Sequence, residues 1–306
     1  MNMSTREAYG RALAKYGKEH EFFVLDADLA KATQTIFFKN EFSDRFFDIG
    51  ISEGDMMTTA AGMASCDKKV FASTFAIFAA GRAYEQVRNS IAYPNLPVVI
   101  GATHGGVMIG EDGASHQAIE DISLMRTMPN MTVVVPCDAE SVTQIVEQSI
   151  SLKSPMYLRT GRGASQDIYT NGEKIVIGKG NVLCDGCDLT IIAIGDLVAQ
   201  ALEAAKILAT EGVSVAVIDM HTVKPIDTDL ITKYAKKTKF IITAEDHSII
   251  GGLGSAVAEI LAETQDAKLK RLGVNDTYGK SGTRDALQKY FNLTAEGIIS
   301  LYKANC

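Results

Sequence analysis

Short runs of apolar residues alternate with longer amphipathic segments along the whole chain. In the first half, six apolar runs end in polar or glycine-bearing tips, and they cover residues 22–26, 46–50, 69–73, 97–101, 131–135 and 156–159. Most of these runs are separated by segments of helical periodicity, the first of them from Thr5 to about Tyr16. Strands separated by helices form parallel sheets that are covered on both faces. The first half is therefore expected to be a doubly wound α/β domain with a six-stranded parallel sheet.

The second half repeats this alternation on a smaller scale. Expected strands over 189–194, 213–219, 239–244 and 269–274 alternate with expected helices over 197–211, 227–237, 252–263 and 283–290. Between the halves the pattern breaks from about residue 163 to 178, where Asn171-Gly172 favours a turn. The sequence thus predicts two domains joined by this linker, one over residues 1–165 and a smaller α/β domain over 176–306.

Composition and charge narrow the class of protein. The chain has 306 residues, an apolar fraction of 46% and a net charge of −7, which together indicate a soluble globular protein. The negative charge disfavours nucleic acid and anionic membranes as partners, since both need a basic surface. No apolar run approaches the roughly 18 residues of a membrane-spanning helix, and the amino terminus lacks the pattern of a signal peptide. We therefore expect a cytoplasmic location and no membrane association.

Two of the five cysteines stand close together in Cys184-Asp185-Gly186-Cys187. Their spacing is that of half a zinc site, but no second pair of Cys or His residues accompanies it. Asp-Gly at the centre is typical of a tight turn. We therefore expect a hairpin between two strands here rather than a zinc site, and the sequence leaves any further role of the two thiols open.

The longest polar loop follows the fourth expected strand. It runs from Thr103 to Gln117 and carries four glycines together with His104, Asp112 and His116. Loops at the carboxyl ends of parallel strands are where α/β sheets bind ligands, and glycine permits a close approach of the backbone. Histidine can bond hydroxyl groups and transfer protons near neutral pH. The loop is therefore a candidate binding site, and the alternative is a surface loop with incidental histidines.

Two carboxylates lie at other strand tips of the first half. Asp28 follows the first expected strand, and Glu53 follows the second. Glu53 stands between an apolar strand and an expected helix from Met56 to Ser65 that is rich in Met and Ala. A carboxyl group in so apolar a place would keep its proton and could donate a hydrogen bond. Glu53 is thus a candidate functional residue rather than a solvated one.

Arg159 and two phenylalanines complete the candidates. Arg159 ends the sixth expected strand, where a guanidinium could hold a phosphate through two bonds, although a surface arginine fits the same pattern. Phe75 and Phe78 lie three residues apart on one face of an expected helix over 75–90. By the residues alone, both phenylalanines are best read as ordinary core.

Several of these strand tips and loops form an ordered series of motifs. The series is Ser52-Glu53-Gly54-Asp55-Met56, Ser73-Thr74-Phe75-Ala76-Ile77-Phe78, His104 with Gly110-Glu111-Asp112-Gly113 and His116, Met128-Pro129-Asn130-Met131, Arg159-Thr160, and Thr243-Ala244-Glu245-Asp246-His247. It resembles the thiamine-diphosphate-dependent transketolases. The resemblance covers this whole chain but only the carboxyl-terminal half of a full-length transketolase, namely its pyrimidine-binding (Pyr) domain and its C-terminal domain. It implies a transferase of carbohydrate metabolism that moves a two-carbon ketol unit from a ketose phosphate to an aldose phosphate.

One motif of such enzymes is missing. They hold the diphosphate and Mg²⁺ with Gly-Asp-Gly and a downstream Asn, and no Gly-Asp-Gly occurs in this sequence. The chain begins with Met1 where the pyrimidine-binding domain of full-length members begins. The resemblance therefore implies the C-terminal subunit of a split transketolase with no metal ligands of its own. It would be active only with an N-terminal subunit that carries the diphosphate-binding domain, in an α2β2 heterotetramer.

The resemblance also implies which residues bind thiamine diphosphate. Glu53 matches the glutamate that bonds N1′ of the aminopyrimidine ring and activates the cofactor. Phe75 and Phe78 match the aromatic residues that lie against this ring, and Asp28 and Leu29 match residues beside it. These five positions are the expected cofactor-binding residues, and Glu53 is an expected catalytic residue.

A second set of matches concerns the sugar. His104 and Asp112 match residues that contact the donor hydroxyl groups, and His116 matches the histidine near the carbonyl group and the path of proton transfer. Arg6, His104 and Arg159 match groups that hold the sugar phosphate. The resemblance thus implies His104 and His116 as catalytic residues and Arg6, His104, Asp112 and Arg159 as substrate-binding residues.

Two positions depart from the pattern. Ala32 stands where the family usually has a phosphate-binding serine, which leaves a sulfonated sugar open as the substrate. Gly81 stands where members tend to carry a third aromatic residue. The alternatives within the cofactor class are a subunit similar to deoxyxylulose-phosphate synthase or to a 2-oxoacid dehydrogenase β chain. A partner protein that has lost its chemistry is a further alternative, and it is disfavoured by the joint presence of Glu53, His104, Asp112, His116 and Arg159.

Overall fold

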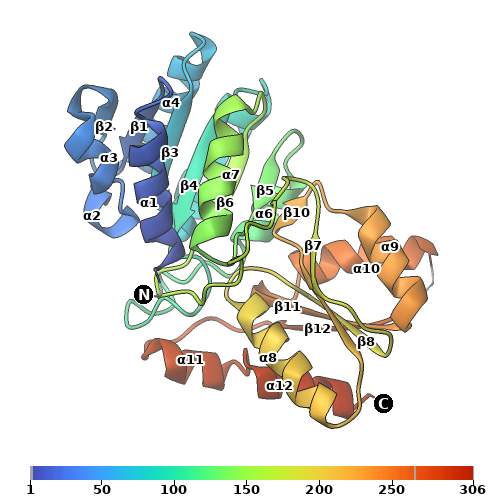
Figure 1. Ribbon diagram of the computed structural model, residues 1–306. Helices are drawn as coiled ribbons and strands as arrows, with labels where there is room; N and C mark the ends of the chain where they lie inside the picture. Colours follow the sequence, from blue (N-terminus) through green and yellow to red (C-terminus); the bar gives the residue numbers. More distant parts are fainter. Residues whose placement is uncertain (1–2, 265–266, 306) are drawn as a thin grey trace.

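The computed structural model describes residues 3–264 and 267–305, which form two twisted sheets with helices on both faces (Figure 1). The first half contains α1 (Thr5–Tyr16), β1 (Phe23–Asp26), α2 (Ala30–Thr33), α3 (Ile36–Glu41), η1 (Ser43–Arg45), β2 (Phe46–Asp48), α4 (Glu53–Ser65), β3 (Val70–Phe75), η2 (Phe78–Arg82), α5 (Tyr84–Gln86), η3 (Val87–Ala92), β4 (Val98–Thr103), α6 (Asp121–Thr127), β5 (Thr132–Val134), α7 (Ala139–Ser151) and β6 (Met156–Arg159). The second half contains β7 (Asn181–Cys184), β8 (Leu189–Ala193), α8 (Leu197–Thr210), β9 (Val215–Asp219), β10 (Thr222–Lys224), α9 (Thr228–Thr238), β11 (Phe240–Ser248), α10 (Leu253–Thr264), β12 (Lys268–Val274), α11 (Arg284–Tyr290) and α12 (Ala295–Lys303).

The first sheet has the order β10-β5-β6-β4-β3-β1-β2. Its six strands from the first half are parallel to one another, as the sequence predicted. The seventh strand, β10, was not predicted, because it comes from the second half of the chain and pairs with β5 in the antiparallel direction. Lys224 at its end donates from Nζ to the carbonyl oxygens of Arg126 and Met128, at the end of α6. The two halves are therefore joined by a shared sheet as well as by the linker.

Helices cover both faces of this sheet. In Figure 1, α1 and α7 lie together in front of it, and α4, η3 and α6 belong to the opposite face. Every residue of β3 and β4 is buried, which explains why these strands read as continuous apolar runs. Helix α1 has the expected bounds: Ser4 begins it by accepting a hydrogen bond from the amide of Glu7, and Gly17 ends it.

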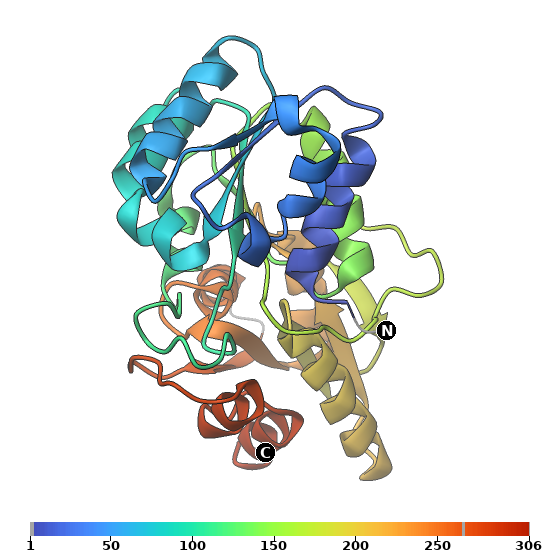
Figure 2. The ribbon, with the colours of Figure 1, turned by 90° about the vertical axis from the view of Figure 1, so that its left-hand side faces the viewer.

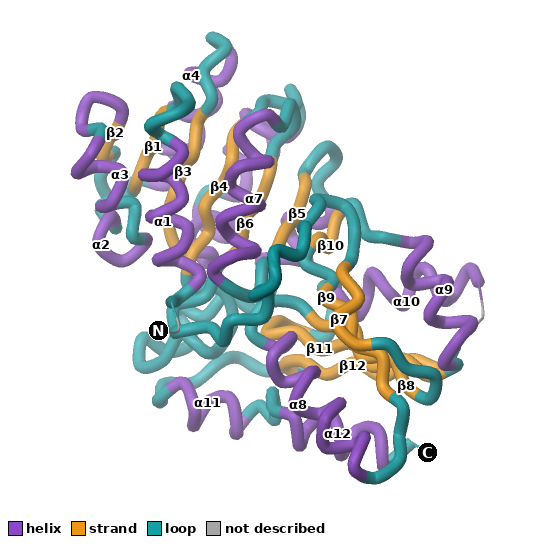
Figure 3. The backbone as a smooth tube through the Cα atoms, viewed as in Figure 1, coloured by secondary structure: helices purple, strands orange, loops and turns teal. Residues whose placement is uncertain are grey.

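The second sheet has the order β12-β11-β8-β9-β7, with β7 antiparallel on one edge (Figure 3). The expected hairpin at Cys184-Cys187 is wrong, because β7 pairs with β9 and not with β8, which follows it in the sequence. The turn crosses the start of β9 instead: a Cβ atom on Gly186 would lie 2.3 Å from the carbonyl carbon of Val215. Glycine is needed here for that close approach, and both thiols are exposed and free.

Two expected boundaries in the first half need correction. β3 extends to Phe75, so Phe75 ends a strand and does not share a helix face with Phe78. The expected helix over 75–90 is mostly π-helical, in η2 and η3, with the short α5 between them. Such wide turns are frequently found at functional sites. Helix α4 begins at Glu53, three residues before the expected start.

The carboxyl ends of the parallel strands face the second sheet. Loops from that edge, among them the polar loop after β4, lie between the two sheets (Figures 1 and 2). Residues 160–180 contain no helix or strand, and Gln148 of α7 holds this segment through bonds to the backbone of Ile175 and Ile177. Across residues 3–264 and 267–305, none of the helices has the length and apolar character needed to cross a bilayer.

Candidate active site

Glu53 is the first residue of α4 and is only 1% exposed. Its Oε2 accepts a hydrogen bond from Nη1 of Arg82 at 2.8 Å, and the Arg82 side chain is 50% exposed. A guanidinium therefore faces Glu53, which the sequence placed between an apolar strand and a helix rich in Met and Ala. Arg82 was missed by the sequence analysis. The sequence did carry a signal for Arg82: it stands four residues after Phe78, and residues four apart in a helix lie on the same side.

Two phenylalanines and two histidines gather beside this pair. Phe75 and Phe78 are nearly parallel, with ring centroids 5.8 Å apart and an interplanar angle of 13°. The ring of His104 lies 3.9 Å from that of Phe75, and the ring of His116 lies 5.4 Å from that of Phe78. The sequence placed the phenylalanines on an expected helix and the histidines on a polar loop, and the structure brings them together because β3 and β4 are neighbours.

His104 is held in an unusual state. Its backbone has φ of +60°, which is uncommon outside glycine and is often found at functional sites. Nδ1 lies 2.9 Å from Oγ1 of Thr103. Burial, together with the positive charges of Arg6 and Arg162, lowers the pKa of His104 to about 3. The imidazole is therefore neutral near pH 7, so it can bond a hydroxyl or a carbonyl group without carrying charge.

The polar loop is fixed against the second sheet. Its Val107 and Met108 amides donate to the carboxylate of Asp246 at 2.8 and 3.3 Å. Gly106 has φ of +86°, and a Cβ atom there would lie 2.0 Å from Oδ2 of Asp246. Gln117 bonds the carbonyl oxygens of Val107 and Lys280 from the other end of the loop. The absence of a side chain at Gly106 thus lets the carboxylate of Asp246, and not a ligand, come close to the loop backbone.

Two arginines meet near His104. Arg6 donates from Nε to the carbonyl oxygen of Arg162 at 3.1 Å and from Nη1 to that of Ala32 at 2.7 Å. Burial and the nearby charge of Arg162 lower the pKa of Arg6. Nη1 of Arg162 lies 3.5 Å from Oδ2 of Asp112, so Asp112 faces this pair as well. Two guanidinium groups near a neutral imidazole form a place that an anion can stabilise.

Arg159 lies elsewhere, in the interior. Its Nε donates to Asp121 at 2.8 Å, and its Nη2 donates to the carbonyl oxygens of Ala118 and Asp246 at 3.1 and 2.9 Å. These bonds connect β6, the polar loop and β11. Arg162, three residues later and missed by the sequence analysis, is the arginine of this segment that lies beside Arg6 and His104.

Asp28 and Leu29 follow β1, which lies beside β3 in the sheet. Asp28 is exposed, has φ of +62° and donates its amide to Asp48 at 3.0 Å. Leu29 donates its amide to Asp26 at 2.6 Å. Asp28 and Leu29 therefore lie at the carboxyl ends of the parallel strands, as Phe75 does.

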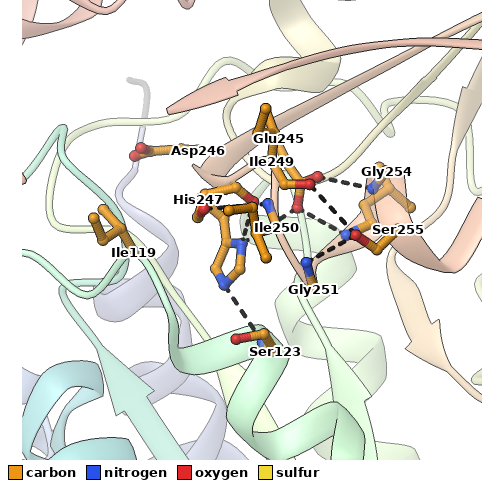
Figure 4. Close-up of polar contacts among 12 residues, drawn as sticks. Ile119, Ser123, Glu245, Asp246, His247, Ile249, Ile250, Gly251, Gly254 and Ser255 are labelled. Atoms are coloured by element: carbon orange, nitrogen blue, oxygen red, sulfur yellow. Dashed lines mark hydrogen bonds and ion pairs between the residues drawn. The ribbon is translucent and has the colours of Figure 1, made fainter. Parts of the chain in front are cut away.

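The Thr243–His247 motif forms polar contacts both within the second half and with the first half (Figure 4). Glu245 faces the first turn of α10 and accepts the amides of Leu253 and Gly254, both at 2.8 Å. His247 points to Ser123 at the start of α6 and accepts its amide at 3.4 Å. A carboxylate at the amino end of a helix is stabilised by unpaired amides and by the helix dipole. These two residues thus join elements of the fold.

Comparison with known proteins identifies the class. Residues 1–166 match the pyrimidine binding domain of transketolase, and residues 178–298 match the transketolase C-terminal domain. The chain therefore belongs to the transketolase family, as its sequence motifs predicted.

Individual relatives match over nearly their whole length. A putative transketolase C-terminal section from Methanocaldococcus jannaschii is 49% identical, and the match covers 96% of this chain and 93% of that protein. The 6-deoxy-6-sulfo-D-fructose transketolase subunit SqwH from Clostridium sp. is 38% identical over 96% of this chain and 92% of its own. Among solved structures, a split gene transketolase described as an inactive β4 tetramer has a TM-score of 0.92 and 47% identity, covering 99% of this chain and 98% of that one.

The Arg159–Asp121 pair yields a prediction about stability. Replacing Asp121 by Ala leaves a buried guanidinium without its counter-charge, which lowers the free energy of unfolding by about 3–5 kcal/mol. Urea unfolding followed by circular dichroism measures this loss. Asp167→Ala, at an exposed position in the segment over 160–180, is the matched control and should change the free energy by no more than about 0.5 kcal/mol. Equal effects of the two substitutions would contradict a structural role for the pair.

Proposed function

We propose that this chain is one subunit of a two-chain transketolase that moves a two-carbon ketol unit from a ketose phosphate to an aldose phosphate. The observation that carries the proposal is the buried Glu53 carboxylate beside the aromatic pair, with His104 and His116 in contact with the same two rings. Arg82 contacts both Glu53 and Phe78, which shows how close these two residues lie. A carboxylate, a flat apolar surface and neutral imidazole at one strand edge suit a planar, nitrogen-containing ring and a polyhydroxylated substrate.

These residues fit thiamine diphosphate, which supplies a nucleophilic carbon and an electron sink for breaking a carbon–carbon bond. Glu53 would bond a nitrogen of its aminopyrimidine ring, and Phe75 and Phe78 would contact the face of that ring. Asp28 and Leu29 would lie beside it. His104 and Asp112 would hold the donor hydroxyl groups, and His116 would exchange protons at the substrate oxygen.

We further propose that the diphosphate and Mg²⁺ ligands come from an N-terminal partner subunit. Within residues 3–264 and 267–305, no group of three or more His, Cys, Asp or Glu side chains could hold a metal ion, and the sequence lacks Gly-Asp-Gly. The similar β4 tetramer, an assembly of β chains alone, is described as inactive. Both observations support dependence on a partner subunit, and we propose that the two chains form an α2β2 enzyme in the cytoplasm.

The anion of the substrate would be held by Arg6, His104 and Arg162. We propose a phosphate, because two guanidinium groups suit a dianion. A sulfonate is the second candidate, favoured by Ala32 in place of a hydroxyl-bearing residue and by the similar subunit named for a sulfonated fructose. Arg159 stays a predicted phosphate ligand from sequence, and the exposure of its side chain, 5% against 36% for Arg162, favours Arg162 in that role.

The first functional prediction concerns dependence on the partner. The isolated chain should bind thiamine diphosphate weakly and show no ketol transfer, because it lacks the proposed diphosphate and Mg²⁺ ligands. Adding a chain that carries Gly-Asp-Gly and its downstream Asn should restore both. Calorimetry and a coupled ketol-transfer assay measure the two effects, and tight Mg²⁺-dependent binding by the isolated chain would show that the proposed division is incorrect.

Glu53→Gln tests the activating carboxylate. The substitution is nearly isosteric, so the two-chain complex should still assemble, while kcat should fall by about 10²–10⁴. The direct measurement is H/D exchange at C2 of the bound cofactor, which should slow with kcat. Glu85→Gln, at a glutamate that bonds Gln86 and Asn89, is the control and should leave exchange unchanged. Exchange at the wild-type rate in Glu53→Gln would remove Glu53 from the activating role.

Arg162→Ala tests the anion site. Charge-assisted hydrogen bonds contribute roughly 1.5–3 kcal/mol each, so KM for an anionic ketose should rise about a hundredfold for a loss near 2.7 kcal/mol. KM for a neutral ketose should change little. Comparing phosphorylated, sulfonated and neutral donors on the two-chain enzyme also identifies the preferred anion. A selective rise in KM with Arg159→Ala and none with Arg162→Ala would restore Arg159 as the anion ligand.

A further inference from the structure

Arg82 makes two contacts at once on the surface of the first half. Its guanidinium carbon lies 4.4 Å above the centroid of the Phe78 ring, and its Nη1 donates to the buried Oε2 of Glu53 at 2.8 Å. The guanidinium is planar, carries N–H donors at its edge and stacks well on aromatic faces. It therefore satisfies a buried carboxylate and covers an aromatic ring in one conformation.

The local backbone explains why Arg82 lies there. The segment Phe78–Arg82 is a π-helical turn closed by a hydrogen bond from the amide of Ala83 to the carbonyl oxygen of Phe78 at 3.1 Å. Residues four apart lie on the same side of such a turn, so Arg82 is carried over Phe78. Gly81 precedes it, and a Cβ atom on Gly81 would meet no atom within 4 Å. The Gly81 position therefore faces open space and puts nothing between Arg82 and the ring.

We propose, on the basis of the function proposed above, that Arg82 is an internal occupant of the pyrimidine site. Its guanidinium donates to Glu53 and stacks on Phe78. The aminopyrimidine ring of the cofactor would make the same two contacts, one with each residue. Arg82 must therefore leave Glu53 and Phe78 before the cofactor binds. In the chain without cofactor, Arg82 supplies the donor that the buried carboxylate of Glu53 would otherwise lack.

This competition has a calculable size. When a site is open in only a fraction of molecules, the apparent affinity falls by that fraction. Occupancy by Arg82 in nine molecules of ten would weaken binding about tenfold. Arg82 can be displaced readily because its side chain is half exposed, so the guanidinium can return to water while a ring takes its place.

The test uses the isolated chain and thiamine, which carries the aminopyrimidine ring but no diphosphate. Ligand-observed NMR titrations compare wild type, Arg82→Ala and the control Arg88→Ala, whose exposed arginine bonds Asn89 in the same helical segment. Arg82→Ala should bind thiamine about tenfold more tightly than wild type, and Arg88→Ala should match wild type. Arg82→Gln, which keeps most of the side-chain length, serves if Arg82→Ala does not fold, and it should also bind more tightly.

A double variant separates this inference from the proposed function. Glu53→Gln combined with Arg82→Ala should lose the gain, since Glu53 is the proposed partner of the ring. If the Arg82 variants bind thiamine no better than wild type, or if no variant binds it, Arg82 is not the occupant of the site. Absence of ketol transfer by the wild-type two-chain enzyme would instead refute the proposed function, and the binding comparison still decides the role of Arg82.

Discussion

The buried guanidinium of Arg159 is the contact on which the arrangement of the two halves depends. It bonds Asp121 at the start of α6, the backbone of the polar loop and the backbone of β11, so three elements converge on one cation. Tyr157 donates to the same carboxylate oxygen at 2.8 Å. Burying a charge is costly unless it is paired and hydrogen-bonded, which favours the arrangement in which these elements meet the guanidinium. The position of the polar loop depends on the same contact. Arg159 bonds the carbonyl oxygen of Asp246, and the carboxylate of Asp246 accepts hydrogen bonds from the loop amides.

The candidate site residues all lie at one edge of the first sheet, and this chain supplies only one wall of the site. The end of β3 supplies Phe75, the end of β4 supplies His104, and the start of α4 supplies Glu53. A parallel sheet brings all of these to a single edge, which is why groups distant in sequence become neighbours. Glu53 is buried, but Arg82 beside it is half exposed, so the site opens to the surface. This one-sided site is what a subunit completed by another chain would present.

The sequence predicted the parts of this structure that follow from local pattern. Six parallel strands and the start of α1 were expected, since period and strand direction determine them. The family was confirmed by comparison, whereas the roles of the site residues and the division at residues 165 and 176 stay predictions. β10 could not be predicted, because three residues carry no distinctive pattern and its partner β5 is remote in sequence. The hairpin was wrong because Asp-Gly indicates a turn but does not say which strands pair.

Two arginines at and beyond the end of β6 show what the sequence could not predict. Arg159 and Arg162 are three residues apart and chemically identical, yet one joins the interior and the other lies beside Arg6. The difference is that Arg159 is still within β6, where its side chain bonds Asp121, Ala118 and Asp246, while Arg162 follows after the chain has left the sheet. A strand boundary of one or two residues therefore decides which guanidinium is available to an anion. Boundaries are set by tertiary pairing, in this case with β4 and β5, and not by the propensities of Arg159 and its neighbours.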